Sequence, residues 1–399
     1  DNTQALVSNY LMFVYASPLV GGWVADKKLG YRKSVMIGGL FFMAGHLLLS
    51  IKAIGVVYAA LTCLVIGNGF FKPNVSAMVG NLYKEGSHLK DRAYSIFYMG
   101  INVGAFTAPI VMEVVQRNFG YHPAFAVAAG GMVISVFTLW RMKKYVEAAD
   151  RPMSKGPKNT ANVAAVTEDA PPASVSRQNA IEGVPDWKRV SALVVIFLIV
   201  IVFWMVFHQN STTITYWANE NTDWKVTGII SNSINPGWVL LLTFPLVAFW
   251  GWLDKKGLEP STPTKMVFGM VMTSLAFFIF FIAAKVGEGS LAPGANPYAY
   301  KMSPVWLLGA YGVLTLGELM LSPMGLSLVS KVAPRRMRGL MMGGWFVATA
   351  IGNKLTQIGE LWDDWLHSSF WITLSAAALV MAFVLLVLLR PLKKAMPGV

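Results

Sequence analysis

Long apolar runs recur along most of the 399-residue chain. A helix needs about 20 consecutive apolar residues to cross the hydrocarbon core of a bilayer, and many of these runs reach that length. Only 13% of the residues are charged, whereas soluble domains carry about 25% charged residues. Because so few charges do not cover the surface of a soluble protein of this size, the sequence predicts an all-α polytopic membrane protein.

Eleven runs are predicted as membrane spans, and no alternating strand pattern competes with them. They cover residues 4–25, 34–52, 56–82, 92–116, 122–146, 190–217, 227–253, 264–285, 304–330, 339–361 and 369–390. Of the 33 Lys and Arg residues, 26 fall in the loops after odd-numbered spans, in segment 147–189 or at the C-terminus. Five fall in the opposite loops and two, Lys72 and Lys354, lie deep inside spans, where cations at the ends of spans are counted with the adjoining loops. Cytoplasmic loops carry an excess of Lys and Arg. We therefore predict that the loops after odd-numbered spans, segment 147–189 and the C-terminus lie on the cytoplasmic side.

The same bias accounts for the net charge of +13 without a nucleic-acid surface, and we expect a multi-pass protein of a bacterial inner membrane. The segment 147–187 is rich in Pro, Ser, Ala and Thr and has few large apolar residues. Such a composition predicts a flexible linker. We therefore predict an N-terminal helical bundle at 1–146, a cytoplasmic linker at 147–187 and a C-terminal bundle at 188–399.

A short motif occurs once in each predicted bundle. Residues 22–30 read GWVADKKLG after the first span, and residues 251–257 read GWLDKKG after the seventh. Four spans follow each copy, but two precede the second copy and only one precedes the first. The simplest interpretation is a 6+6 architecture that lacks its first helix, and a true eleven-span protein is the alternative. Transporters built from two such parallel halves bind substrate in a central cavity between them.

Three charged residues lie deep inside predicted spans, where a charge costs at least about 2.5 kcal/mol and usually faces a cavity or a partner. One of them, Lys354, has no partner that the sequence identifies, so its structural and functional interpretations both stay open. Lys72 lies near the middle of its span in the first half, and Glu318 lies near the middle of its span in the second half. A lysine at this depth suits a substrate carboxylate, and a glutamate suits a proton or a substrate ammonium. Structural ion pairing within one half is the alternative for Lys72, and a satisfied buried carboxyl for Glu318.

Other polar residues in the spans are candidates with weaker support. His208 is a possible proton carrier because the reference pKa of His, about 6.5, is near physiological pH, although a lone His is more often a packing residue. Tyr15, Asn102 and Asn235 could hydrogen-bond a substrate, or equally join helices. Trp204 and Trp345 could form cavity walls, although most Trp residues in membrane proteins lie at interfaces or in packing.

The first inner loop combines an acid with several cations. Asp26 is followed by Lys27 and Lys28, and then by Arg32 and Lys33. Simple anchoring at the inner surface explains the cations, but not the repeat of the acid in both halves. We therefore predict a gating contact that involves Asp26, Arg32 and Lys33 and that breaks when the halves move.

No enzyme constellation is present in the sequence. There is no His-Glu-x-x-His pattern and no phosphate-binding loop. The single cysteine, Cys63, excludes disulfides and cysteine-rich metal sites. We expect no enzymatic activity, no metal and no cofactor other than protons as the coupling ion.

Several motifs resemble those of the proton-coupled oligopeptide transporter family, a branch of the major facilitator superfamily. The resemblance covers nearly the whole chain outside the linker. It includes the loop around Asp26, residues 67–74 (GNGFFKPN), residues 91–92 (DR) with 97–104 (FYMGINVG), 235–236 (NP), 317–323 (GELMLSP) and 343–353 (GGWFVATAIGN). The fifth-helix signature at 97–104 is highly specific.

The resemblance implies roles for individual residues. Lys72 would meet the carboxylate of a peptide and take part in proton coupling, and Asn102 would hydrogen-bond the peptide backbone. Glu318 would meet the peptide ammonium, with Asn235 and Ser322 nearby. Tyr15 would line the site, and Trp204 and Trp345 would form walls of side-chain pockets.

Two features depart from the family pattern. The Glu-x-x-Glu-Arg signature of the family's first helix is absent, which agrees with the symmetry argument and removes proton-coupling and carboxylate-binding groups that the resemblance implies. His208 stands where many members have an acid, and it is a candidate to replace that acid as a protonatable group.

The sequence thus predicts a major facilitator fold and a proton-coupled symporter that imports di- and tripeptides by alternating access as a monomer. The alternatives are a same-fold carrier of another solute, such as nitrate or a drug, and a non-transporting peptide sensor.

Overall fold

The computed structural model describes residues 2–83, 87, 89–150, 183–223, 233–362 and 364–397. Most of the predicted linker, residues 151–182, lies outside the described residues. Within the described ranges the chain is almost entirely helical, and an isolated bridge joins Thr222 to Met302. The prediction of an all-α protein is therefore confirmed.

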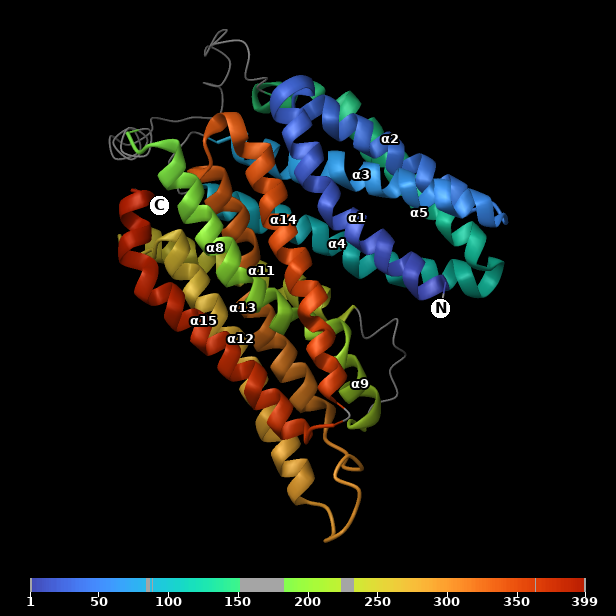
Figure 1. The fold of residues 1–399 in the computed structure, drawn as a ribbon, viewed down its shortest axis with the longest axis vertical. Coiled ribbons are helices and arrows are strands. Elements are labelled where there is room, and N and C mark those ends of the chain that lie inside the picture. The colour runs from blue at the N-terminus through green and yellow to red at the C-terminus, as the bar shows by residue number, and fades with distance from the viewer. Residues whose placement is uncertain are drawn as a thin grey trace.

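The first half of the chain forms one bundle. It consists of α1 (Asn2–Val24), α2 (Tyr31–Leu49), α3 (Ile54–Asn81), α4 (Leu89–Phe119) and α5 (Tyr121–Arg141). A short π-helix (Ala25–Leu29) joins α1 to α2, and the short α6 (Lys143–Val146) follows α5 (Figure 1).

The second half forms the other bundle. It consists of α8 (Asp186–Phe207), α9 (Thr213–Glu220), α11 (Ile234–Lys255), α12 (Thr262–Gly289), α13 (Pro304–Val332), α14 (Arg338–Leu355) and α15 (His367–Ala395). A helix of 18 to 31 residues thus occupies each of the eleven predicted spans. Eight of the described helical segments are long and apolar enough to cross a membrane. The helices α1, α2 and α14 are not among those eight.

Two predicted spans are shorter as helices than the apolar pattern indicates. The span 190–217 is interrupted by a 3-10 turn at His208–Ser211, and the span 339–361 changes to a 3-10 helix at Thr356. At the first break, the side chain of Gln209 accepts hydrogen bonds from the hydroxyls of Thr212 and Thr213. Polar side chains of this kind compete with the helical backbone pattern and favour turns.

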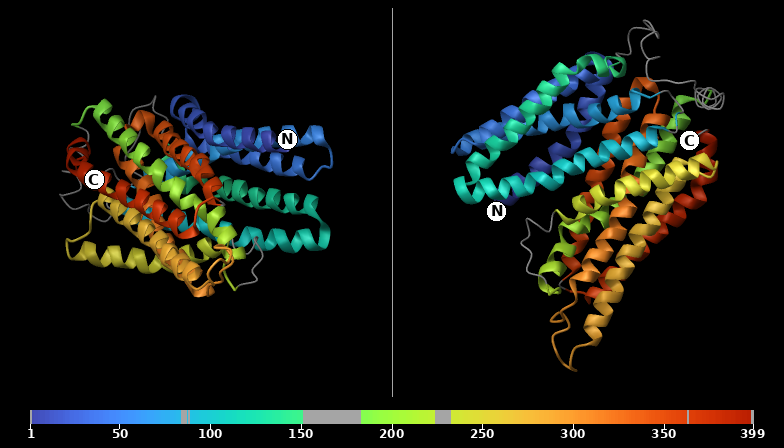
Figure 2. Two further views of the ribbon diagram at one scale, coloured as in Figure 1. Left: turned by 60° about the horizontal axis from the view of Figure 1, so that its bottom comes forward. Right: turned by 180° about the vertical axis from the view of Figure 1, so that it is seen from behind.

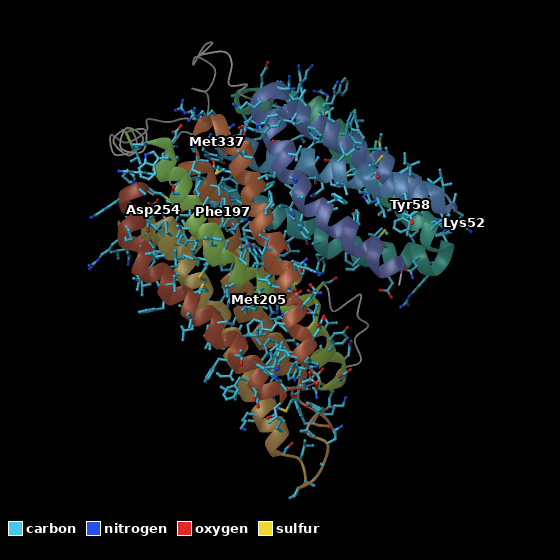
Figure 3. The ribbon with its side chains drawn as sticks, in the orientation of Figure 1. Lys52, Tyr58, Phe197, Met205, Asp254 and Met337 are labelled. Carbon is cyan, nitrogen blue, oxygen red and sulfur yellow. The ribbon has the colours of Figure 1, made fainter. Side chains whose placement is uncertain are left out.

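The two bundles meet at one end of the molecule and diverge towards the other (Figures 1 and 2). Asp254 and Met337 lie at the end where they meet, whereas Lys52 and Tyr58 lie at the opposite end of the first bundle (Figure 3). We call the first the linker end, because α6 and the start of α8, between which the linker runs, lie there. We call the second the far end.

Glycines allow the bundles to approach closely at the linker end. A Cβ atom added at Gly22 of α1 would lie 2.2 Å from the carbonyl oxygen of Gly339 on α14. A Cβ atom at Gly80 of α3 would lie 1.8 Å from Oγ of Ser330 on α13. No side chain fits at either distance, so the closed linker end requires glycine at these positions.

Candidate functional site

Glu318 lies at the contact between the bundles. It is 3% exposed and accepts a hydrogen bond from the hydroxyl of Tyr98 on α4, in the opposite bundle. Nδ2 of Asn235 on α11 donates to the other carboxyl oxygen of Glu318 at 2.8 Å and to Oγ1 of Thr315 at 3.1 Å. The structure therefore brings Asn235 to Glu318, as predicted, and adds Tyr98, which sequence reasoning had not singled out.

Lys72 extends from α3 towards the second bundle. Its Nζ atom lies 4.7 Å from the ring centre of Phe346 on α14, an arrangement that stabilises a cation by its interaction with the ring. The side chain is exposed although it belongs to the middle of a long helix. Among the described residues Lys72 forms no ion pair, so its charge remains available to an anionic group.

An aromatic group stands beside Lys72 in the second bundle. The rings of Trp204 and His208 stack with centroids 5.1 Å apart, and Trp204 lies 6.4 Å from Trp345. Nε1 of Trp204 is buried without a hydrogen-bond partner among the described residues. Trp345 itself is 2% exposed, so it packs inside the bundle.

The remaining predicted binding residues lie near the same interface. Nδ2 of Asn102 donates to the carbonyl of Tyr98 one helical turn before it, at 2.9 Å. The hydroxyl of Tyr15 on α1 accepts a hydrogen bond from Asn353 of α14 at 2.9 Å. Ser322 is buried on α13, one turn after Glu318.

Asp26 connects the two bundles at the linker end. Its carboxylate accepts hydrogen bonds from the backbone N–H groups of Gly339 at 3.0 Å and Leu340 at 2.8 Å, at the N-terminal turn of α14. The hydroxyl of Tyr31 donates to it at 2.7 Å. Burial raises the pKa of Asp26, and these hydrogen bonds offset only part of that rise. An acid at a helix N-terminus also complements the helix dipole.

Arg32 and Lys33, which the sequence grouped with Asp26, make no described contact with the second bundle. Nε of Arg32 lies 3.3 Å from Asp150, in the same half of the chain. Lys33 is exposed on α2 and has no ion pair among the described residues. Asp26 is therefore the member of the predicted gating group that the structure places across the interface.

Asp91 forms a second connection between the bundles. This residue at the start of α4 is 4% exposed, and Nζ atoms from two helices of the opposite bundle approach its carboxylate. Lys265 of α12 lies at 2.9 Å and Lys331 of α13 at 2.6 Å. The hydroxyls of Thr262 and Ser327 donate to it as well.

Further polar contacts surround this group. Arg92 pairs with Asp254 at 2.7 Å, and Arg338 donates to Asn81. The sequence identified Asp91 and Arg92 only as part of a motif. The signal that could have revealed their contacts is the position of Asp91 at the inner end of one half, while Lys265 and Lys331 stand at the inner ends of two spans in the other half.

No group of three or more metal-ligating side chains occurs among the described residues. The arrangement instead presents one cation and one carboxylate on opposite bundles, with neutral donors and aromatic rings around them. Such a set of side chains can bind and orient a charged ligand and can exchange protons. It holds no nucleophile paired with a base.

The sequence matches the family model described as the POT family over residues 32–168 and 158–360. It is 31% identical over 453 residues to a peptide transporter of Yersinia enterocolitica, covering 99% of this chain and 87% of that protein. It is also 28% identical over 447 residues to a di-/tripeptide transporter of Lactococcus lactis, covering 99% of this chain and 88% of that protein.

Solved structures give the same result for the fold. A crystal structure of a mutant peptide transporter POT in complex with alafosfalin matches with a TM-score of 0.67 and 29% identity, over 99% of this chain and 87% of the other. The sulfate complex of a peptide transporter POT matches with a TM-score of 0.69 and 26% identity, over 98% of this chain and 86% of the other.

Proposed function

The chain belongs to the POT family, whose members are transporters rather than enzymes, and from this premise we propose that it imports di- and tripeptides together with protons. It is a multi-pass membrane protein with the fold of the family's peptide transporters. The names of its relatives, which include di-/tripeptide transporters, support small peptides as the substrates.

The observation that carries the proposal is the placement of opposite charges on opposite bundles. Lys72 belongs to the first bundle and Glu318 to the second, and the structure shows no ion pair between them. A zwitterionic peptide supplies a carboxylate for Lys72 and an ammonium for Glu318. Each ionic contact would be charge-assisted and therefore stronger than a neutral hydrogen bond. The span between the two groups would limit the length of the peptide.

The neutral groups complete this proposed site. The partnerless Nε1 of Trp204 would donate to a peptide carbonyl, and Asn102 and Tyr15 would contact the peptide backbone. Ser322 and Asn235 would support Glu318. Because Tyr98 and Asn235 hold Glu318 by hydrogen bonds, a peptide ammonium must compete with or join these donors.

Proton coupling would use groups that face this same interface. Glu318 is the proposed proton acceptor. Protonation would neutralise its carboxylate and so remove its attraction for a peptide ammonium. Lys72 and His208 are further candidates for proton exchange at this interface. A proton or a peptide shifts the balance between conformations only by binding them with different affinity.

We place the linker end in the cytoplasm, because the excess of basic loops lies there. The conformation is then closed to the cytoplasm, with Asp26 and Asp91 holding the bundles together. Alternating access would require these contacts to break. The protein would function as a monomer in a bacterial inner membrane.

The test is peptide uptake into liposomes that carry an inward proton gradient. Lys72→Ala should abolish accumulation of a dipeptide, because loss of a group that pairs with a buried charge costs about 2–5 kcal/mol, or at least about 30-fold in affinity. Lys52→Ala is the matched control, because Lys52 is exposed at the far end. Equal accumulation by wild type and Lys72→Ala would exclude the proposed site.

The same assay separates the other candidate functions. Dipeptides, but not nitrate, should compete for uptake if peptides are the substrates. A non-transporting sensor would bind a dipeptide without accumulating it in response to the proton gradient.

A further inference from the structure

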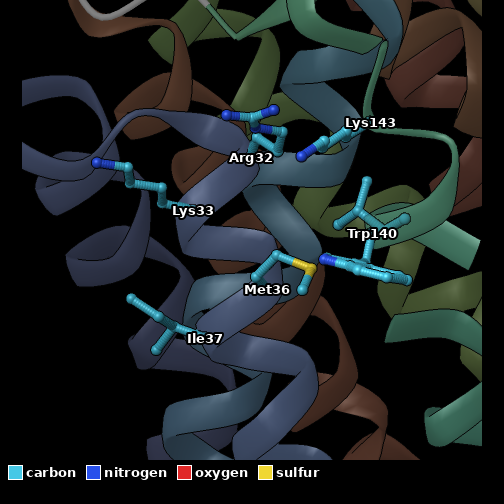
Figure 4. A pocket seen from close by; sticks show the side chains of 7 residues that line it. Arg32, Lys33, Met36, Ile37, Trp140 and Lys143 are labelled. Carbon is cyan, nitrogen blue, oxygen red and sulfur yellow. The ribbon is translucent and has the colours of Figure 1, made fainter. Parts of the chain in front are cut away.

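A groove of about 370 Å³ lies on the outer surface of the first bundle, away from the proposed peptide site. It is formed where the start of α2 packs beside the end of α5 and the short α6 (Figure 4). Both elements are at the linker end, where the helices leave the membrane. The lining residues are Arg32, Lys33, Met36, Ile37, Leu139, Trp140 and Lys143.

Three cations line one end of the groove. Arg32 and Lys143 lie close together at its upper end in Figure 4, and the side chain of Lys33 leaves α2 on the left. Asp150 contacts Nε of Arg32 at 3.3 Å and also accepts a hydrogen bond from its backbone N–H at 3.1 Å. These contacts orient the guanidinium while leaving its terminal nitrogens for another acceptor.

Lys33 and Lys143 are not neutralised by the chain itself. Neither lysine has an ion pair among the described residues, and both are exposed. The nearby acid Asp26 is buried and already accepts hydrogen bonds from α14 and Tyr31. The groove therefore carries an excess of about two positive charges, which is what a phosphate group would compensate.

The rest of the groove is apolar. Met36, Ile37 and Leu139 follow the cations along α2 and α5 towards the middle of the membrane. Trp140 is 57% exposed at the level of the bilayer surface, where Trp side chains are favoured. A ligand that fills the groove must therefore have an anionic end at the surface and an apolar part that extends into the bilayer.

We infer that this groove is a binding site for an anionic phospholipid. The headgroup phosphate contacts Lys143 and Arg32, Lys33 adds a further positive charge at the edge of the groove, and an acyl chain lies along Ile37 and Trp140. Basic pockets between membrane helices on the cytoplasmic side are suited to anionic headgroups. A free phosphate ion would use the cations but would leave the apolar wall without a function. The bound lipid bridges α2 and α5 at the surface of the first bundle.

The test measures the lipid that the purified full chain retains, by native mass spectrometry after transfer from mixed phosphatidylglycerol and phosphatidylcholine nanodiscs. Wild type should retain phosphatidylglycerol in preference to phosphatidylcholine. The double variant Lys33→Gln/Lys143→Gln should lower that retention about 10- to 30-fold, because each surface cation contributes about 1 kcal/mol to binding of anionic lipid. The matched control is Lys393→Gln/Lys394→Gln, which removes the same charge from the exposed end of α15.

Equal retention in the wild type and in the Lys33/Lys143 variant would overturn the inference, as would an equal loss in the Lys393/Lys394 control. Size-exclusion profiles of all variants in detergent check that each one is folded.

The apolar half of the groove needs its own test. Trp140→Ser should also weaken retention of phosphatidylglycerol, whereas Trp187→Ser, which changes another exposed Trp at the linker end, should not. Displacement of the lipid by a large excess of inorganic phosphate, or no effect of Trp140→Ser, would instead indicate a simple anion site and contradict the lipid assignment.

Discussion

The interface between the bundles differs sharply between its two ends. At the linker end the helices approach so closely that a Cβ atom at Gly22 would overlap the backbone of Gly339. Further along the interface, a Cβ atom added at Gly237 of α11 would lie 3.5 Å from the ring of Phe106 on α4, which is an ordinary contact distance. Among the described residues, the hydrogen bonds of Tyr98 with Glu318 and of Tyr15 with Asn353 are the inter-bundle hydrogen bonds furthest from the linker end.

This difference shows where the free energy of closure is concentrated. The linker end combines close glycine contacts with buried carboxylates that accept hydrogen bonds from the opposite bundle. Opening that end exposes those groups to water, whereas opening the far end breaks no described charge pair. Variants at the linker end should therefore shift the conformational balance strongly, and matched variants beyond Glu318 should shift it little.

The largest effect is expected for Asp91→Asn. The substitution leaves the buried Lys331 without a carboxylate partner and Lys265 with Glu259 alone, at 2.7 Å, and loss of one member of a buried ion pair costs about 3–5 kcal/mol. The closed linker end should become at least about 100-fold less favoured. A Ser330→Cys reporter in a Cys63→Ser background should then react correspondingly faster with a maleimide, because Ser330 is fully buried in the closed form.

Asp254→Asn is the matched control for this experiment. Its partner Arg92 also lies 3.6 Å from Glu259, and the side chain of Asp254 is 34% exposed. An exposed pair of this kind contributes about 0.2–1 kcal/mol, so the labelling rate should rise only a few-fold. Equal rates in the Asp91 and Asp254 variants would show that the buried network does not hold the linker end closed.

Gly339→Ala should produce the next largest effect. Its Cβ atom would lie 2.7 Å from the carbonyl oxygen of Gly22, and overpacking of a tight contact costs about 1–3 kcal/mol. Labelling of the Ser330→Cys reporter should increase about tenfold or more. Gly104→Ala adds the same methyl group on α4, where space is open, and it should leave the rate unchanged. An increase in both variants would indicate general loosening of the helices.

Closure should also depend on the pH at the linker end through Asp26. Burial raises the pKa of this carboxyl, so the closed form binds the proton more tightly than an open form in which Asp26 is exposed to water. Acidification through the raised pKa should favour closure, and this extra stability should be lost as the pH rises above it. One proton changes the equilibrium by at most about tenfold per pH unit.

Asp26→Asn removes the titrating group and should abolish this pH dependence. The comparison is made between the reporter in the wild-type and Asp26→Asn backgrounds at each pH, because maleimide labelling has its own pH dependence. Parallel pH profiles in the two backgrounds would rule out Asp26 as the source.

The sequence predicted the spans because apolar runs and basic loops respond directly to the bilayer. It also singled out Lys72 and Glu318 as candidate binding residues, since a charge in the middle of a span differs clearly from its apolar neighbours. It did not predict the contacts of Asp91, because a carboxylate at a helix end is compatible with solvent exposure, and its partners Lys265 and Lys331 resembled surface anchors. Only the packing of one half against the other distinguishes the two interpretations.

The different contacts of Asp26 and of its neighbours Arg32 and Lys33 were not predictable from the sequence either. The sequence grouped Arg32 and Lys33 with Asp26 because all three lie in one inner loop. The direction in which each side chain leaves the start of α2 depends on its helical position, and a neighbour such as Asp150 comes from a distant segment. Spacing alone therefore did not show that these cations face away from the second bundle.

The smallest effect is expected where the interface approaches the far end. Nδ2 of Asn353 donates to the hydroxyl of Tyr15 at 2.9 Å, and hydrogen bonds between membrane helices contribute about 0.6 kcal/mol on average. Tyr15→Phe and Asn353→Ala should each change the labelling rate about threefold, and the double variant should add little to either single change. A change above about tenfold in the Tyr15→Phe variant would mean that closure is not concentrated at the linker end. Because Tyr15→Phe removes only an oxygen atom, such a result would not be explained by a packing defect.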